Sequence, residues 1–211
     1  MGIYLKKFEN HTQYETYIND SGAILPNVSI CTIEGDVHYN PFVDPYNGHQ
    51  YVDLGLPSGT LWAKYDVGAT SESEYGNEYE WGAGDKTYQE TEGHSDWPEE
   101  EDGYLVESAD TAIQVWGGSW HMPTQTQFAE LKESTTYEWI TDFNGSGING
   151  GKFTSKTDTT NYVFFPYGTY WSSYNDGEYI SFLSVDEPPY NCNTGGNSDI
   201  HVPAYIRPVI G

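Results

Sequence analysis

The chain consists largely of short strand-like runs separated by glycine and proline, and few segments have a helical period. The runs that follow Tyr137 are YEWIT, GKFTSK, NYVFFP, TYWSS, EYISFLS and AYIRPVI. Runs this short, rich in aromatic and β-branched residues, are typical of antiparallel strands. Aromatic residues make up 16% of the chain, so large rings can supply the core that the modest aliphatic content cannot. The pattern predicts a loop-rich, mostly β globule.

One helix start is clearly marked, in the segment MPTQTQFAELKES. Thr124 can cap a helix whose third residue is Gln127, which is the pattern of a capping box. Phe128 and Leu131 then lie on one face. The sequence predicts a helix over residues 124–134.

A second helix is expected over residues 108–115, with apolar positions at Ala109, Ala112, Ile113 and Val115. The segment YGNEYEWGAG alternates aromatic and polar residues, as a half-buried strand does. With two helices among many strands, the expected fold class is α+β.

Residues 1–40 are expected to form a separate strand-helix-hairpin appendage. A strand is predicted at Ile3–Leu5, a helix at Asn10–Asn19, and a hairpin around Glu34-Gly35-Asp36. The segment PFVDPYNGHQ, residues 41–50, has the composition of a linker. Residues 51–211 then form the main domain.

The charge balance is 8 basic against 32 acidic residues, a net charge of −24. Such a field repels nucleic acids and anionic membranes, so neither is an expected partner. The acidic segment Glu90–Glu107 has two interpretations, a solvated loop or a calcium site. No signal peptide or membrane-spanning segment is recognised, so synthesis in a bacterial cytoplasm is expected, without membrane insertion.

No catalytic motif stands out, and the chain is expected not to be an enzyme. GSGING, residues 145–150, matches a dinucleotide fingerprint, but a strand-like run follows it where that fingerprint requires a helix. It is therefore interpreted as a β-turn loop. Cys31 and Cys192 fit no zinc spacing and are expected to be free thiols. No cofactor is expected, and calcium remains open.

Three segments carry a family resemblance. YVDLGLPSGTLWAKYDVGATSESEYGNEYEWG, DTAIQVWGGSWHMPTQTQFAEL, and TYWSS with the final IRPVI resemble the major-paralogous-domain family. That resemblance covers residues 51–211 and implies a C-type-lectin-like domain, a fold shared with formylglycine-generating enzymes and with retroelement-diversified receptor-binding proteins of phages. The opening segment, YLKKFENHTQYETYI, is similar to segments of phage structural proteins. Trp62, Trp81, Trp116 and Trp120 are expected to be scaffold residues.

Four functions are compatible with this resemblance. The first is a non-catalytic binding module with a variable ligand surface, and the second is a formylglycine-generating type of enzyme. The second needs paired reactive cysteines, whereas Cys31 belongs to the appendage and Cys192 to a loop. The third is a carbohydrate-binding lectin, calcium-dependent or not, although the calcium motifs of lectins are missing around Glu187-Pro188-Pro189. The fourth is a purely structural decoration of a particle.

The C-terminal segment favours the binding module. Adenine-directed mutagenesis of Asn codons, as the resemblance implies, cannot produce Lys, Glu, Gln, Trp or Met, and none of these occurs from Pro188 to Gly211. The segment is also rich in Tyr, Asn, Ser, Gly and Asp, the residues of adaptable binding surfaces.

The expected variable surface is solvent-exposed and non-catalytic, and Tyr190 and Tyr205 are its expected anchors. Its residues are Tyr174, Asn175, Asp176, Glu178, Ser184, Asp186, Tyr190, Asn191, Asn193, Asn197, Asp199, His201 and Tyr205. The buried scaffold expected beneath it is Trp171, Phe182, Ile206 and Val209. The resemblance implies a host-surface protein or glycan as ligand, and a virion or other exposed particle that the protein joins through residues 1–40.

Overall fold

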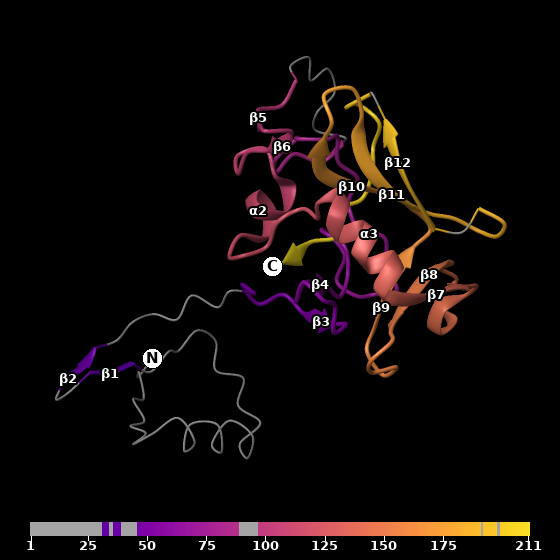
Figure 1. Cartoon of the computed structure of the whole chain (residues 1–211), viewed down its shortest axis with the longest axis horizontal. Helices are drawn as coiled ribbons and strands as arrows, with labels where there is room; N and C mark the ends of the chain where they lie inside the picture. The colour runs from indigo at the N-terminus through magenta and orange to yellow at the C-terminus, as the bar shows by residue number, and fades with distance from the viewer. Residues whose placement is uncertain (1–30, 34–35, 39–45, 89–96, 191, 198) are drawn as a thin grey trace. The chain divides into compact units, whose positions relative to one another are not determined.

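The computed structural model describes residues 31–33, 36–38, 46–88, 97–190, 192–197 and 199–211 (Figure 1). The chain divides into two compact units, Met1–Asp44 and Pro45–Gly211. This division falls inside the segment 41–50 that is expected to be a linker. In the first unit, β1 (Cys31–Ile33) and β2 (Asp36–His38) pair antiparallel, which confirms the expected hairpin. The strand expected at Ile3–Leu5 and the helix expected at Asn10–Asn19 lie outside the described residues.

The second unit has an α+β fold, as the sequence predicts, with three antiparallel sheets and two α-helices among its described residues. The first sheet has the order β12-β11-β10-β6-β5, the second β13-β4-β3 and the third β7-β8-β9. The strands and helices are β3 (Tyr51–Asp53), β4 (Leu61–Ala63), β5 (Glu100–Glu101), β6 (Tyr104–Leu105), α2 (Thr111–Trp116), α3 (Gln125–Ser134), β7 (Thr135–Ile140), the 3₁₀ turn η2 (Phe143–Gly145), β8 (Gly150–Ser155), β9 (Tyr162–Pro166), β10 (Gly168–Asn175), β11 (Ile180–Val185), β12 (Cys192–Asn197) and β13 (Val209–Ile210).

Helix α3 begins as the sequence predicts. The backbone N–H of Gln127 donates to Oγ1 of Thr124 at 3.2 Å, and the backbone N–H of Thr124 donates to Oε1 of Gln127 at 2.8 Å, which completes the capping box. Phe128 and Leu131 are fully buried. The helix contacts β10, β11 and β12 and also β7 and β8 (Figure 1).

Helix α2 begins at Thr111, three residues later than the predicted start at Ser108. The side chain of Asp110 is the reason, because its Oδ1 accepts the N–H of Ile113 at 3.0 Å and so caps the helix at that point. With this start Trp116 lies on the buried face, whereas Val115, which the sequence places among the apolar positions, is 41% exposed.

Two further segments differ from expectation. Tyr75–Gly84 is not a strand and forms only an isolated bridge, Tyr79 with Ala204. At its end Gly82 and Gly84 turn the chain with positive φ. In the acidic segment, β5 and β6 form a hairpin in place of a loop. Its turn is Asp102-Gly103, with φ of 51° and 82°, the conformation that favours Asp-Gly in two-residue hairpins.

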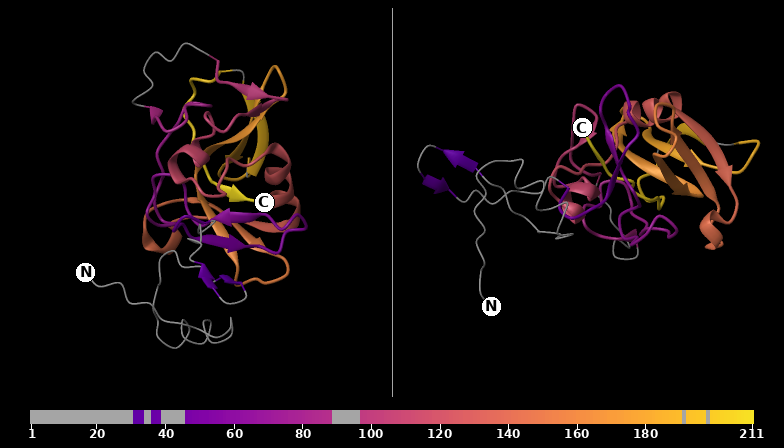
Figure 2. Two further views of the ribbon diagram at one scale, coloured as in Figure 1. Left: turned by 90° about the vertical axis from the view of Figure 1, so that its left-hand side faces the viewer. Right: turned by 90° about the horizontal axis from the view of Figure 1, so that it is seen from below.

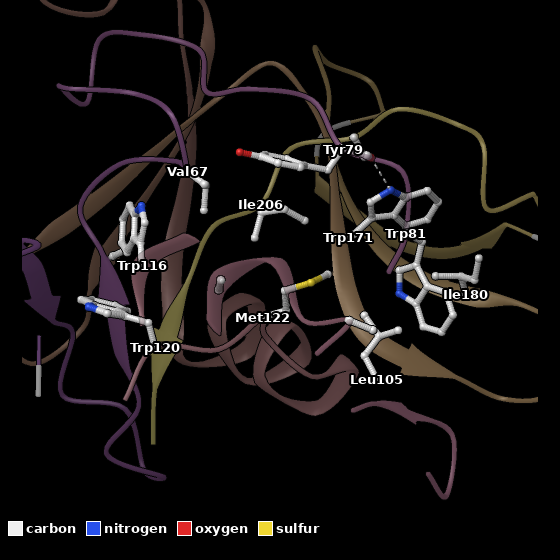
Figure 3. Packing of buried hydrophobic residues seen from close by; sticks show 14 of the residues in the cluster. Val67, Tyr79, Trp81, Leu105, Trp116, Trp120, Met122, Trp171, Ile180 and Ile206 are labelled. Carbon is white, nitrogen blue, oxygen red and sulfur yellow. Dashed lines mark hydrogen bonds between the residues drawn. The ribbon is translucent and has the colours of Figure 1, made fainter. Parts of the chain in front are cut away.

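The core has two parts, which we call the α2 core and the α3 core. The α2 core includes Ala112 and Trp116 of α2, and the α3 core includes Phe128 and Leu131 of α3. Figure 3 shows the indoles of the α2 core at its two ends. Trp116 and Trp120 lie at one end, and Trp81 and Trp171 lie at the other.

Neighbouring residues of one strand enter different parts of the core. In β4 the side chain of Trp62 belongs to the α3 core and that of Ala63 to the α2 core; in β10 the same holds for Tyr170 and Trp171. Successive side chains of a strand point to opposite faces, so these strands separate two apolar layers. This explains why runs such as TYWSS are nearly continuous in apolar and small residues.

Strand β13 lies beside the strands that open the second unit. Val209 pairs with Trp62, and Trp62 pairs with Val52, so β13, β4 and β3 form one sheet (Figure 2, left). Of the run AYIRPVI, only Val209–Ile210 is a strand. Pro208 has no N–H to donate to a ladder, which limits the pairing of this segment.

Candidate functional site

A cavity of about 330 Å³ opens beside the first residues of β10 and contains three of the expected surface residues, Ser184, Asp186 and Tyr205. The other residues that line it come from distant parts of the chain. They are Tyr75, Glu78, Tyr167, Gly168, Thr169, Pro203 and Ala204. We call this the tyrosine cavity.

Tyr205 is held in the cavity wall by its backbone. Its N–H donates to the carbonyl of Thr169 at 2.9 Å, and its carbonyl accepts the N–H of Trp171 at 3.1 Å. Its ring lies 5.5 Å from the ring of Tyr75 and 5.7 Å from the buried ring of Tyr170, measured between centroids. Tyr205 is therefore half-buried and rigidly placed, and is less exposed than expected.

Gly168 gives the Tyr205 ring its space. A Cβ at this position would lie 2.8 Å from Cε2 of Tyr205, and φ of Gly168 is 152°, which side chains rarely adopt. The phenol is also partly removed from water. Burial, the nearby Glu78 carboxylate and Tyr75 raise the pKa of Tyr205 to about 12.

The register of the sheet places more of the expected residues on the same side. Thr169 pairs with Ser184, and Ser184 pairs with Asn193, so these three side chains share one face. Asn197, four residues after Asn193 on β12, lies on that face as well. Both Asn193 and Asn197 are accessible, with Asn193 the more exposed.

Residues 174–178, at the hairpin between β10 and β11, form a second group. Asp176 and Glu178 are exposed, and Oδ1 of Asp176 accepts the N–H of Glu178 at 2.9 Å, which fixes the turn. Tyr174 is half-buried against Tyr104 of β6, with ring centroids 5.0 Å apart.

The expectation of an exposed Asn175 is wrong, since it is only 2% exposed. Its Nδ2 donates to Glu100 Oε2 at 2.9 Å, its Oδ1 accepts the N–H of Gly177 at 2.8 Å, and its own N–H donates to the carbonyl of Gly103 at 2.7 Å. An amide with this many partners joins the hairpin to β5 and β6, and it belongs to the scaffold.

Asp199 and His201 are exposed, and His201 lies beside a buried carboxylate. Nδ1 of His201 is 3.2 Å from Oε1 of Glu80, which is itself buried. The N–H of His201 donates to Oδ1 of Asp199 at 2.9 Å, so the two residues form one local turn.

Tyr190 is the most exposed large hydrophobic side chain of the described residues, at 72%. It lies in the connection between β11 and β12, where its carbonyl accepts Nδ2 of Asn193 at 2.7 Å. Asn191, also expected in the surface, lies outside the described residues.

Three of the four expected scaffold side chains, Trp171, Ile206 and Val209, are fully buried. Phe182 is only half-buried, so the expectation was wrong there. The reason is its neighbour on β12. Gly195 stands opposite Phe182 and has no side chain to cover the ring, and a Cβ there would lie 2.6 Å from Cζ of Phe182.

The second cavity, of about 510 Å³, contains none of the expected residues. It lies around β3 and the start of β9, where the hydroxyl of Tyr162 donates to Oε1 of Glu72 at 3.2 Å. Lys64 contributes a positive charge to its wall, in contrast to the tyrosine cavity.

Cys192 has the character of an inert thiol. Burial is the largest cause, and it raises the pKa of Cys192 to about 12 although Lys132 opposes the shift. The thiolate is the reactive form of cysteine, so this thiol is a poor nucleophile at neutral pH. Among the described residues no group of three or more His, Cys, Asp or Glu is arranged to hold a metal ion. Residues 90–96 of the acidic segment lie outside the described residues.

The sequence interpretation missed Tyr75, Glu78 and Tyr167. Tyr75 and Glu78 belong to a segment whose alternating aromatic and polar residues predict a strand, and Tyr167 follows the run NYVFFP. No local pattern distinguishes them from other aromatic and acidic residues of a chain with 19 tyrosines. Tyr75 and Glu78 reach the cavity because their segment lies beside Pro203–Tyr205, next to the bridge between Tyr79 and Ala204.

No described helix has the length and apolar character required to span a bilayer. Comparison of the chain with family models, with curated proteins and with solved structures finds no match.

Proposed function

We propose that this protein is a non-catalytic receptor-binding module with a C-type-lectin-like domain, whose ligand surface is built on β11, β12 and the residues that follow them. The observation that carries the proposal is the convergence of Ser184, Asp186 and Tyr205 on one cavity, with Asn193 and Asn197 on the same face of the sheet. A recognition surface needs this arrangement of accessible polar and aromatic side chains on a rigid support.

The packing of this region supports tolerance to substitution. Beneath the surface, Leu183 and Val185 belong to the α3 core, whereas Ser184 between them points to the accessible face. A change at Ser184 or Asn193 removes no core contact. This is the property that diversification by a retroelement requires, and we include such diversification of the segment after Pro188 in the proposal.

The low reactivity that burial gives the Cys192 thiol supports a binding role over formylglycine-type catalysis. That chemistry depends on reactive cysteines, and the pKa of this thiol is raised to about 12. A host-surface protein or glycan is the proposed ligand, and a phage particle, joined through Met1–Asp44, is the proposed location.

The test is binding to arrays of bacterial surface proteins and glycans, with and without calcium. We expect a ligand whose binding is lost in Tyr190→Ala and Tyr205→Ala. Tyr51→Ala is the matched control, because Tyr51 is an exposed tyrosine of β3 outside the surface. Circular dichroism verifies that each variant is folded. Unchanged binding of both surface variants would overturn the proposal.

The diversification and particle assignments have separate tests. Sequencing of the flanking DNA is expected to show a reverse-transcriptase gene and a near-copy of the 3′ end that differs at adenines. Deletion of residues 1–44 is expected to abolish incorporation into particles. A normal level of incorporation would reject the attachment role.

A further inference from the structure

The walls of the tyrosine cavity combine aromatic rings with carboxylates. Tyr75, Tyr167 and Tyr205 contribute the rings, and Glu78 and Asp186 contribute the carboxylates. Among the described residues that line it there is no Lys, Arg or His. An anionic ligand would therefore meet like charges in this cavity and no cationic side chain of a described residue.

The rings are supported from below. Tyr205 packs on the buried Tyr170 and beside Tyr75, whose ring plane is inclined to it by 30°. Tyr167 is half exposed, and its ring meets the indole of Trp139 at an interplanar angle of 89° with centroids 6.2 Å apart. Rings fixed in this way lose little conformational entropy when a ligand binds.

The carboxylates are also oriented. The hydroxyl of Ser184 donates to Oδ2 of Asp186, and the hydroxyl of Tyr205 interacts with Glu78. Each carboxylate has further lone pairs for a ligand, because an ionised carboxylate accepts about four hydrogen bonds.

We propose that the tyrosine cavity binds the alkylammonium group of a ligand. An ammonium is attracted both to the negative faces of aromatic rings and to carboxylates, and clusters of rings with acidic residues are suited to quaternary and substituted ammonium groups. The net charge of −24 adds a long-range attraction for cations.

The size of the cavity agrees with a head group. Its volume of about 330 Å³ is at the lower end of small-molecule sites, so it accepts one substituted ammonium group and not a large ligand. The inference rests on the proposed binding function and specifies one chemical contact in it. The source of the group, a lysine side chain or a quaternary head group, is distinguished by the probes below.

The test is a titration of the isotope-labelled whole chain with small probes, followed by backbone amide shifts at constant ionic strength. The cationic probes are n-butylammonium, which represents lysine, and tetramethylammonium, which represents a quaternary head group. The neutral probes are tert-butanol and methyl α-glucoside. We expect saturable shifts of Thr169 and Ser184 with at least one cation, and none with the neutral probes. Sodium chloride is expected to weaken binding.

The variants identify the site. Glu78→Gln and Asp186→Asn are each expected to weaken cation binding by about tenfold, the usual scale of one partly desolvated charge contact. Glu133→Gln is the matched control, because it makes the same charge change at an exposed position of α3. Equal binding of the neutral probes, or equal weakening by Glu133→Gln, would overturn the inference.

The two proposals can fail separately. If the arrays identify a ligand that depends on Tyr190 but neither ammonium probe binds, the binding function stands and the cation site is rejected. If the probes bind at Glu78 and Asp186 but no array ligand is found, the cation site stands and the receptor-binding proposal is rejected.

Discussion

Nε of Arg207 lies 2.5 Å from Oδ1 of Asp66, and both side chains are completely buried. The remaining guanidinium bonds go to backbone carbonyls, those of Ala63, Lys64 and Phe164, at 3.3, 3.1 and 3.0 Å. Burial raises the pKa of the Asp66 carboxyl, while Arg207 opposes that shift. The arginine thus joins β4, the loop after it and β9.

Removal of one member of this pair is expected to be strongly destabilising. Arg207→Met leaves Asp66 buried without its cation, and the free energy of unfolding is expected to fall by about 3–5 kcal/mol. The double variant Asp66→Leu/Arg207→Met removes both charges and is expected to be more stable than the single variant. Urea unfolding measures both. A single variant within about 0.5 kcal/mol of the parent, the range of neutral surface changes, would contradict this role.

Two fully buried indoles are expected to respond differently to replacement by Phe. Nε1 of Trp81 donates to the carbonyl of Ser172 at 2.8 Å, whereas Nε1 of Trp62 has no partner among the described residues. Both changes remove the same atoms, but only Trp81→Phe also removes the donor for a buried carbonyl, which costs about 1–3 kcal/mol. Thermal unfolding is expected to show Trp81→Phe as the less stable variant. Equal stabilities would show that the hydrogen bond contributes nothing.

Tyr205 is expected to keep its proton until strongly alkaline pH. Its pKa is raised from 10.0 to about 12, mainly by burial, so the folded state binds more protons than the unfolded state between these values. Its contribution to stability is fully present below pH 10 and is lost as the pH rises through about 12. Ultraviolet titration at the phenolate band should show a late step that Tyr205→Phe reduces. A parent protein without a late step, or a late step that Tyr205→Phe leaves unchanged, would refute the raised pKa of Tyr205.

Gly168 is expected to control the position of that phenol. Gly168→Ala places a methyl group against the Tyr205 ring and is expected to cost about 1–3 kcal/mol through overpacking, beyond the backbone strain. Gly177→Ala is the control for strain, because Gly177 also has positive φ, 95°, but no neighbour within 4 Å of its Cβ position. Unfolding experiments and the Tyr205 titration measure the difference. Similar effects of both changes would exclude the steric role.

Cys192 is expected to resist alkylation in the folded protein. In a Cys31→Ser background, iodoacetamide at neutral pH should modify Cys192 slowly, because the pKa of its thiol is about 12 and little thiolate is present. Urea exposes the side chain and is expected to restore an ordinary rate. A native rate equal to the unfolded rate would contradict this, and would reopen the catalytic interpretation.

The local features of the fold could be predicted from the sequence because neighbouring residues determine them. Thr124 and Gln127 form their capping box with atoms only three positions apart, and the runs around Phe153, Val163 and Phe182 are strands with short connections. The Glu34-Gly35-Asp36 hairpin is of the same kind.

The buried position of Asp110 and the role of Asn175 depend on distant partners. Asp110 caps α2 locally through the N–H of Ile113, but its carboxylate also accepts the N–H of Met122, and Asn175 donates to Glu100. A polar residue in a loop-like sequence can be either a surface group or a buried junction, and the choice depends on which donors the fold brings to it.

The candidate site shows the same division. The sequence by itself determined the α+β class, the aromatic core and the small, polar character of the segment after Pro188. Only the tertiary structure decided that Tyr75 and Glu78 lie against Tyr205 in the wall of one cavity, and that Ser184 and Asn193 share one face. The register of β10, β11 and β12 and the pairing of distant segments set these positions. Both depend on how two apolar layers pack on opposite faces of the same strands. Local sequence patterns do not encode that packing.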